Sequence, residues 1–335
     1  MTSKRLGRWT IAFPGSPRIV SATSVVGPKE GEGPLRSYFD VVEQDPMRGE
    51  VCAEAAERRF MEDACNRALS QIALANDDVD LFLGGDLLNQ VITASFTARS
   101  LQIPFVGLYS ACATIGAGLT LAATLVDSDW ATTVLVAGAS HYQTAERQYR
   151  YPIELNVQRK QTNQWTVTGA GAAVIAKQGN GPKITQATIG RVVDYGLKDT
   201  NDMGCAMAPA AADTFLRHLA DTGRTPGDYD LIMTGDLAAY GKKMFKQLVK
   251  DAGIALGGKH QDAGELIFSQ QQKVGAGGSG CACLAVVGFG YVLKEMAAAR
   301  WHRVLLLPTG ALHSPVTYQQ GESIPCVAHA IVVET

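Results

Sequence analysis

The stretch LYSACATIGAGL at residues 108–119 decides the fold that this sequence predicts. A single cysteine, Cys112, stands among small residues, after an apolar run and before a long segment rich in Ala, Leu and Thr. This order is typical of a strand that leads into a buried helix, with the cysteine at the junction. A thiol at a helix N-terminus lies in a positive backbone field, which lowers its pKa and activates it. The alternative is a small core side chain, since free cysteines are often buried.

The composition describes a globular chain with a large core. Of 335 residues, 46% are hydrophobic and 19% are charged, which excludes a disordered protein. The formal net charge of −2 gives no broad basic surface, so nucleic acid is not an expected partner. Seven scattered cysteines argue against a disulfide framework and for a reducing compartment. The pair Cys281 and Cys283 lacks metal-ligand spacing, so we expect no metal site.

Two uncharged stretches, residues 103–126 and 274–293, approach the length of a transmembrane helix. Both are rich in Gly, Ala, Ser and Thr, whose insertion into a bilayer is unfavourable. We therefore expect buried helices of a soluble protein, and peripheral association with a membrane complex stays open. The N-terminal 15 residues carry no sustained apolar run, so they do not resemble a secretory signal.

Strand-like and helix-like patterns alternate along the chain. The expected strands lie at residues 10–14, 17–26, 81–83, 104–108, 132–140, 183–195, 230–234, 303–308 and 327–334, and residues 165–176 are expected to form a strand, a glycine turn and a second strand. The expected helices lie at residues 50–76, 94–101, 115–126, 208–222 and 244–251, and residues 274–293 are expected to begin with a glycine-rich turn and continue as a long helix to residue 299. The helix at 50–76 is expected to bury Val51 and Ile72, residues 28–33 should form a loop, and residues 142–164 a polar insertion.

The second half of the chain repeats the order of the first: helix, strand, buried helix, strand. We interpret this as an internal duplication, with one half at residues 1–180 carrying Cys112 and the other at 181–335 carrying Gly277, Gly278 and Ser279. Alternation of strands and helices predicts a layered α/β protein with largely parallel strands.

Three motifs resemble the thiolase superfamily, in particular its type III ketoacyl-ACP synthases. The SACA at residues 110–113 matches the Ala-Cys of that family, VLVAGA at 134–139 matches its VLVVGAE strand, and VTGAGAAVI at 167–175 matches its FGDGAGAVVL turn. The resemblance implies a thiolase-like fold of two duplicated halves in α-β-α-β-α layers, and a homodimer.

Two catalytic groups of the condensing enzymes do not appear where the resemblance places them. The family's Pro-His-Gln-Ala-Asn corresponds to TGDLA at residues 234–238, and its Gly-Asn-Thr-Ser to the glycine run at 274–281. The missing His and Asn hold the thioester carbonyl and stabilise the enolate. Asp236, when ionised, offers acceptors only and cannot replace the imidazole. The sequence therefore indicates a protein that is not a condensing enzyme.

The glycine run, together with LGGDLLNQ at residues 83–90 and MTGDL at 233–237, resembles a non-condensing subgroup of the superfamily from spore-forming bacteria. That resemblance implies binding of dipicolinic acid (pyridine-2,6-dicarboxylate), free or as its calcium chelate, for uptake into the developing spore. No cofactor is implied, and calcium enters only with the ligand. The expected partners are membrane-embedded subunits of the same transport system. This chain itself is expected to be cytoplasmic and peripheral to the inner membrane of the spore.

The former acyl pocket is expected where the N-termini of the two buried helices converge. This places Cys112 opposite Gly277, Gly278 and Ser279, whose backbone amides suit a dicarboxylate. The same glycines also permit close helix packing, which is the alternative interpretation.

Three polar residues outside these segments complete the candidate ligand-binding set. Asp86 and Asn89 follow a strand end, where sites of open sheets gather, and Asp86 is also a candidate helix cap. His260, upstream of the glycine run, is the third candidate, and Lys259 beside it is placed to meet a carboxylate; the alternative is a His and a Lys of a surface loop.

Two other functions stay open from the sequence. One is acyl transfer from acyl-CoA or acyl-ACP through a covalent thioester on Cys112. The other is a structural subunit that scaffolds membrane partners.

Overall fold

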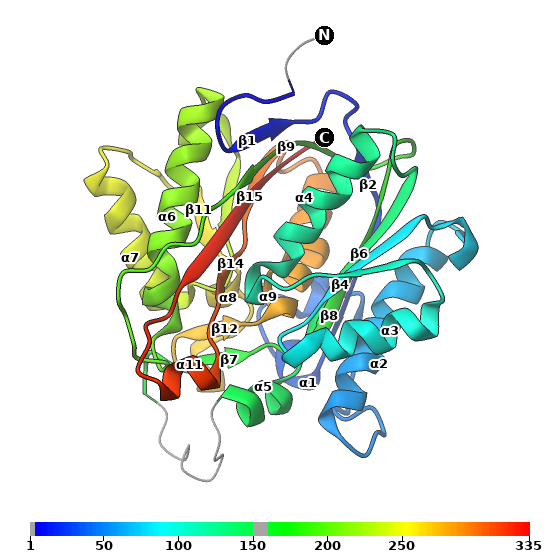
Figure 1. The fold of residues 1–335 in the computed structure, drawn as a ribbon, viewed down its shortest axis with the longest axis horizontal. Helices are drawn as coiled ribbons and strands as arrows, with labels where there is room; N and C mark the ends of the chain where they lie inside the picture. The colour runs from blue at the N-terminus through cyan, green and yellow to red at the C-terminus, as the bar shows by residue number, and fades with distance from the viewer. Residues whose placement is uncertain (1–3, 150–159) are drawn as a thin grey trace.

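Residues 4–149 and 160–335 are described by a computed structural model, in which helices flank and separate the two halves of a mixed sheet (Figure 1). The predicted polar insertion therefore lies partly outside the described residues. Its first part forms a helix, and its last residues begin a strand.

The described residues of the first half form eight strands and five α-helices. The strands are β1 (Thr10–Ala12), β2 (Arg18–Val26), β3 (Val41–Val42), β4 (Leu81–Gly85), β5 (Phe105–Gly107), β6 (Thr133–Ser140), β7 (Gln164–Thr166) and β8 (Gly169–Ala176). The helices are α1 (Pro28–Gly31), α2 (Ala53–Ser70), α3 (Ile92–Leu101), α4 (Thr114–Asp127) and α5 (Tyr142–Tyr149). A 3-10 turn, η4 (Ala111–Ala113), precedes α4.

The second half supplies the remaining elements. The strands are β9 (Lys183–Ile189), β10 (Leu231–Thr234), β11 (His260–Asp262), β12 (Gly277–Ser279), β13 (Arg303–Leu307), β14 (Thr309–Ala311) and β15 (Cys326–Glu334). The helices are α6 (Met203–Thr222), α7 (Ala238–Asp251), α8 (Ala263–Leu266), α9 (Cys281–Val286), α10 (Leu293–Ala297) and α11 (Pro315–Gln319). A π-helical turn at Val287–Val292 joins α9 to α10.

The strand order of the two halves is the same, as the predicted duplication requires. It runs β2-β8-β6-β4-β5 in one half and β9-β15-β13-β10-β11 in the other. The expectation of largely parallel strands is wrong, because β8 and β15 run antiparallel to both of their neighbours in this order. Antiparallel neighbours, unlike parallel ones, do not need a long crossover connection.

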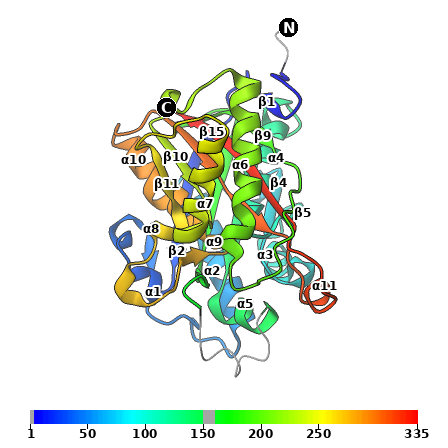
Figure 2. The same ribbon diagram turned by 90° about the vertical axis from the view of Figure 1, so that its left-hand side faces the viewer.

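Helices cover the sheet in three layers, which gives the five-layer arrangement (Figures 1 and 2). The outer face of the first half is covered by α2 and α3, that of the second half by α6 and α7, and α4 and α9 lie between the halves. Every residue of β6 and β8 is buried, because helices cover both faces of these strands. Within the described residues, no helix is both long and apolar enough to cross a membrane.

One predicted helix differs from the structure at both ends. The helix expected at 50–76 is α2, which begins after Cys52, so Val51 is 98% exposed and Ile72 lies in the following turn at 38%. The glycine-rich segment expected before the second buried helix forms the strand β12, and the helix begins after it, at α9. The homodimer stays a prediction. Strand β5 lies at the edge of the sheet, and its residue Val106 is exposed.

The loop expected at residues 28–33 is also wrong, since it contains the short helix α1. Its Pro28 occupies the first turn, where a missing N–H costs nothing. The turn buries Glu30 completely, and the Glu30 carboxylate accepts a hydrogen bond of 2.9 Å from the backbone N–H of Thr168, just before β8. Burial raises the pKa of Glu30 to about 7 and outweighs that hydrogen bond.

This buried carboxyl makes stability depend on pH. The pKa of Glu30 is higher in the folded state than in the unfolded state. The contribution of this carboxyl to the free energy of unfolding is therefore fully present below the unfolded-state pKa and is lost as pH rises through about 7. We expect Glu30→Gln to reduce the fall in unfolding free energy between about pH 5 and about pH 8 by about 3 kcal/mol. Urea denaturation at the two pH values measures this difference. The control is Glu32→Gln, which replaces an exposed neighbour and should keep the wild-type dependence of the unfolding free energy on pH. The same dependence in Glu30→Gln as in the wild type would contradict the raised pKa of Glu30.

Candidate functional site

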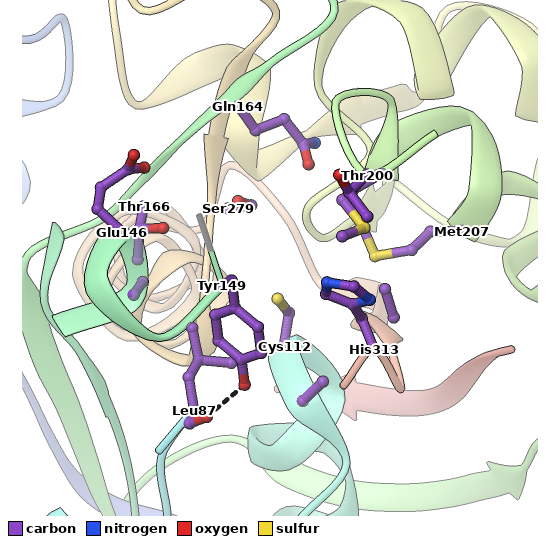
Figure 3. Close-up of a pocket in the computed structure, with 14 residues that line it drawn as sticks. Leu87, Cys112, Glu146, Tyr149, Gln164, Thr166, Thr200, Met207, Ser279 and His313 are labelled. Atoms are coloured by element: carbon purple, nitrogen blue, oxygen red, sulfur yellow. Dashed lines mark hydrogen bonds between the residues drawn. The ribbon is translucent and has the colours of Figure 1, made fainter. Parts of the chain in front are cut away.

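A pocket with a cavity volume of about 70 Å³ opens beside the turn that carries Cys112 (Figure 3). Its walls come from η4, α5, the paired strands β7 and β12, the start of α6 and the segment after β14. The lining residues are Leu87, Ala111, Cys112, Ala145, Glu146, Tyr149, Gln164, Thr166, Thr200, Met203, Met207, Ser279, Ala311 and His313.

The turn that presents Cys112 is held by short-range hydrogen bonds and by a close crossing. Ala111 adopts a φ of 48°, and the Thr114 hydroxyl donates to the Ala111 carbonyl at 2.6 Å. Strand β14 crosses directly above, where a Cβ on Gly310 would lie 2.2 Å from the Ser110 carbonyl oxygen. Only glycine fits at this crossing, so the thiol has one fixed direction into the pocket.

The N-termini of the two central helices converge at this turn, as predicted. The thiol of Cys281, at the start of α9, donates to the Ala111 carbonyl with a separation of 2.9 Å. The side chain of Ser140 links the two halves further, since its hydroxyl accepts from the backbone N–H of Ala282 at 3.1 Å and donates to the Val167 carbonyl at 2.8 Å.

The expected activation of Cys112 by the helix field is wrong. Burial raises the pKa of the Cys112 thiol well above its usual value, and the nearby Asp236 carboxyl raises it further. The hydrogen bond from the backbone N–H of Gly280 acts in the opposite direction but is the smaller effect. Desolvation therefore dominates, and Cys112 is a neutral thiol at neutral pH.

One wall of the pocket is polar because two short strands pair there in parallel. In the register of β7 and β12, Gly277 lies opposite Gln164 and Ser279 opposite Thr166. Alternation along a strand directs Gln164 and Thr166 to the same face, and Ser279 stands beside Thr166 (Figure 3). The Gln164 amide donates to the Asp236 carbonyl at 2.5 Å, which fixes its orientation.

The facing wall is aromatic and apolar. The rings of Tyr149 and His313 lie 5.6 Å apart between centroids at 35°, and His313 also contacts Tyr318 at 5.9 Å. The Tyr149 hydroxyl donates to the Leu87 carbonyl at 2.5 Å, the bond drawn in Figure 3. Met207 of α6 lies beyond His313 (Figure 3).

Of the seven predicted ligand-binding residues, the structure brings only Cys112 and Ser279 to the pocket. Gly277 and Gly278 lie in β12 just before Ser279, and their role is packing: a Cβ on Gly277, at a φ of 135°, would lie 2.4 Å from the Gly264 carbonyl oxygen. The packing interpretation of these glycines is therefore the one that their contacts favour.

Asp86 and Asn89 lie outside the pocket. Asp86 is buried, and its carboxylate accepts from the backbone N–H groups of Leu88 and Ala94, both at 2.8 Å. Asp86 therefore caps the first turn of α3, which is the alternative to ligand binding that the sequence offered for this residue. Asn89 is exposed and its backbone N–H donates to the side-chain oxygen of Gln148 at 3.1 Å.

His260 is neither a pocket residue nor a surface residue. It is 5% exposed in β11, its Nε2 lies 2.9 Å from the Thr234 hydroxyl, and its ring packs 4.8 Å from that of Phe245. Burial lowers the pKa of His260 to about 3, with a smaller contribution from nearby lysines. The expected surface loop is wrong because the strand at this position is covered by α7.

Asp236 occupies the position after β10 where the resemblance expects a histidine. It is fully buried, and burial together with the Asp262 carboxyl raises its pKa well above the usual value. The neutral acid is therefore favoured, and it carries an O–H donor, so the argument from an ionised carboxylate does not apply in the folded protein. Asp236 does not line the pocket.

His313, Tyr149, Glu146 and the start of α6 are pocket residues that the sequence reasoning missed. His313 could have been predicted as a site residue because it closely follows a strand of the second half, in the sequence ALHSP at residues 311–315. Among the residues that the structure describes, no group of three or more His, Cys, Asp or Glu side chains is placed to hold a metal ion.

The fold and the position of the cysteine turn define a protein of the thiolase-like class. The structure is similar to 3-oxoacyl-[acyl-carrier-protein] synthase III from Aquifex aeolicus, with a TM-score of 0.60 and 13% identity over 95% of this chain and 100% of that one. It is also similar to OleA from Xanthomonas campestris, with a TM-score of 0.64 and 15% identity over 98% and 100% of the two chains. At these identities the likeness concerns the fold alone.

The chain belongs to the stage V sporulation protein AD (SpoVAD) family. The model of that family matches residues 7–334. The curated stage V sporulation protein AD of Bacillus subtilis (strain 168) is 46% identical over 331 residues, which cover 99% of this chain and 98% of that protein. Membership supports a role in sporulation.

The raised pKa of Cys112 has a direct chemical consequence. We expect iodoacetamide at neutral pH to modify Cys112 at least about tenfold more slowly than the exposed Cys52, because only the thiolate reacts. Peptide mapping by mass spectrometry over a time course measures both rates. Faster labelling of Cys112 than of Cys52 would indicate an activated nucleophile instead.

Proposed function

We propose that this protein binds dipicolinate, free or as its calcium chelate, in the pocket beside Cys112 and without catalysis. The observation that carries the proposal is the pairing of two unlike walls in one pocket, hydroxyl and amide groups on one side and rings and thioethers on the other. The family's role in sporulation gives this ligand its context.

The polar wall fits the carboxylates of the ligand. Ser279, Thr166 and Thr200 offer hydroxyl donors, and none of the described lining residues is a lysine or arginine. A dianion is therefore held by neutral donors, each of which forms a hydrogen bond to a charged acceptor worth about 1.5–3 kcal/mol. Neutral donors also leave an exchangeable ligand, which suits uptake.

The apolar wall fits the pyridine ring. Tyr149 and His313 present ring faces and edges, and Met203 and Met207 present flexible thioethers that adapt to an aromatic partner. The neutral thiol of Cys112 stands between the walls as a small polarizable contact. A neutral thiol also weighs against the alternative of acyl transfer, which needs the thiolate.

We further propose that the protein delivers dipicolinate beside membrane-embedded subunits of the same transport system, as a cytoplasmic protein peripheral to the inner membrane of the spore. Its support is the family's role in sporulation, together with an open pocket and an unactivated cysteine.

Calorimetric titration with dipicolinate tests the binding function through three variants. Thr166→Val and Ser279→Ala each remove one hydroxyl of the polar wall, and His313→Ala removes one ring of the apolar wall. We expect each hydroxyl variant to bind about 10- to 100-fold more weakly than the wild type, the value of one hydrogen bond to a charged group, and His313→Ala to bind about tenfold more weakly through loss of a ring contact. The matched control is Asn89→Ala, outside the pocket, which should bind like the wild type. Absence of saturable heat with millimolar dipicolinate in the wild-type protein would refute the function.

The calcium dependence of binding should depend on Glu146. It is the one carboxylate among the described lining residues, so it repels a free dianion and attracts the calcium of a chelate. We expect Glu146→Gln to shift the ratio of affinities by about tenfold toward the free ligand, measured by titrations with calcium and with a chelator. Glu322→Gln, an exposed carboxylate elsewhere, should leave the ratio unchanged. An unchanged ratio in Glu146→Gln would place the calcium away from this residue.

A further inference from the structure

Helix α7 carries a stripe of lysines on a surface that the pocket does not use. Lys243, Lys246 and Lys250 are exposed, and their spacing of three and four residues places them on one side of the helix. The whole chain has a formal net charge of −2, so this stripe is a local concentration of positive charge. Figure 2 shows α7 on the outer face of the molecule, in front of the sheet.

The described part of the chain does not neutralise the charge of the stripe. Across residues 4–149 and 160–335, no carboxylate lies within ion-pair distance of these three lysines, whereas the neighbouring Lys242 pairs with Glu265. The nearest acid in sequence, Asp251, accepts a hydrogen bond of 2.7 Å from Gln247. The stripe is therefore free to meet an external anion.

Two exposed apolar side chains border the lysines. Tyr240 is 37% exposed, and the ammonium group of Lys243 lies 5.6 Å from the centre of its ring. Met244 is 41% exposed and lies on the next part of the helix surface. Lys246 and Lys250 border an open hollow of about 440 Å³ whose other side is the loop at residues 253–257. This loop, GIALG, contributes no charged side chain.

We propose that this α7 face docks on the surface of a bilayer that contains anionic lipids. Ammonium groups meet lipid phosphates at the depth where the exposed tyrosine ring and methionine enter the headgroup layer. Lys246 and Lys250 line the hollow, so its charge complements an anionic headgroup. The proposal rests on the peripheral membrane association proposed above and adds to it the face and the lipid chemistry.

The docking face is rigidly connected to the pocket. Helix α7 packs on α6 through Phe215 and Phe245, whose rings lie 5.7 Å apart, and a Cβ on Gly241 would lie 2.4 Å from the Gly204 carbonyl oxygen. The start of the same α6 supplies Met203 and Met207 to the pocket. A bilayer bound at α7 therefore fixes the direction in which the pocket opens.

Co-sedimentation of the full chain with vesicles tests the proposal. The vesicles are phosphatidylcholine alone, or phosphatidylcholine with phosphatidylglycerol. We expect binding only to the anionic vesicles and weakening by salt, and a loss of more than about tenfold in the triple variant Lys243→Gln, Lys246→Gln, Lys250→Gln. The matched control replaces three scattered exposed lysines, Lys177, Lys198 and Lys294, by glutamine and should bind like the wild type.

The other outcomes distinguish a failure of the α7 docking face from a failure of peripheral membrane association. If the wild type binds anionic vesicles and the α7 variant binds them equally, membrane association holds and the α7 face is wrong. The wild type could instead bind neither kind of protein-free vesicle and still sediment with native membranes. The α7 face would then bind an acidic membrane protein, and the proposal that it binds anionic lipids would be overturned. Dipicolinate titration of the triple variant should match the wild type, which shows that it is folded.

Discussion

The close approach of the two central helices at the cysteine turn is the constraint on which the rest of the structure depends. The Cys281 thiol meets the Ala111 carbonyl at 2.9 Å, and β14 crosses the same turn at Gly310 with no space for a Cβ. These contacts join elements from both halves of the chain. They fix the position of Cys112, and the strands β7 and β12 then build the polar wall around it.

Burial, rather than the helix field, determines the chemistry of this site. The start of a helix stabilises a thiolate when water or a cation reaches it, but Cys112 is desolvated and lies near Asp236. Asp236 is itself buried beside Asp262, which favours its neutral form. The neutral forms of Cys112 and Asp236 are therefore both favoured by burial.

The two halves share a topology but contribute differently to the proposed function. The first half provides the cysteine turn and α5, with Tyr149 and Glu146. The second half provides Ser279, His313 and helix α6, and it also carries the basic face of α7. Because α6 contacts the pocket at its start and α7 along its length, one rigid helix pair connects ligand and membrane in the proposed arrangement.

The sequence by itself determined the layered α/β fold, the cysteine at a strand–helix junction and the convergence of two buried helices, because apolar periodicity and short motifs are local. It also placed Cys112 and Ser279 at the site. It did not predict the antiparallel β8 and β15, or the positions of His260 and Asp86, because strand direction and burial arise from contacts between distant segments. Only the tertiary structure brought Tyr149 and His313 together across 164 positions of sequence, and only burial decided that the Cys112 thiol stays neutral.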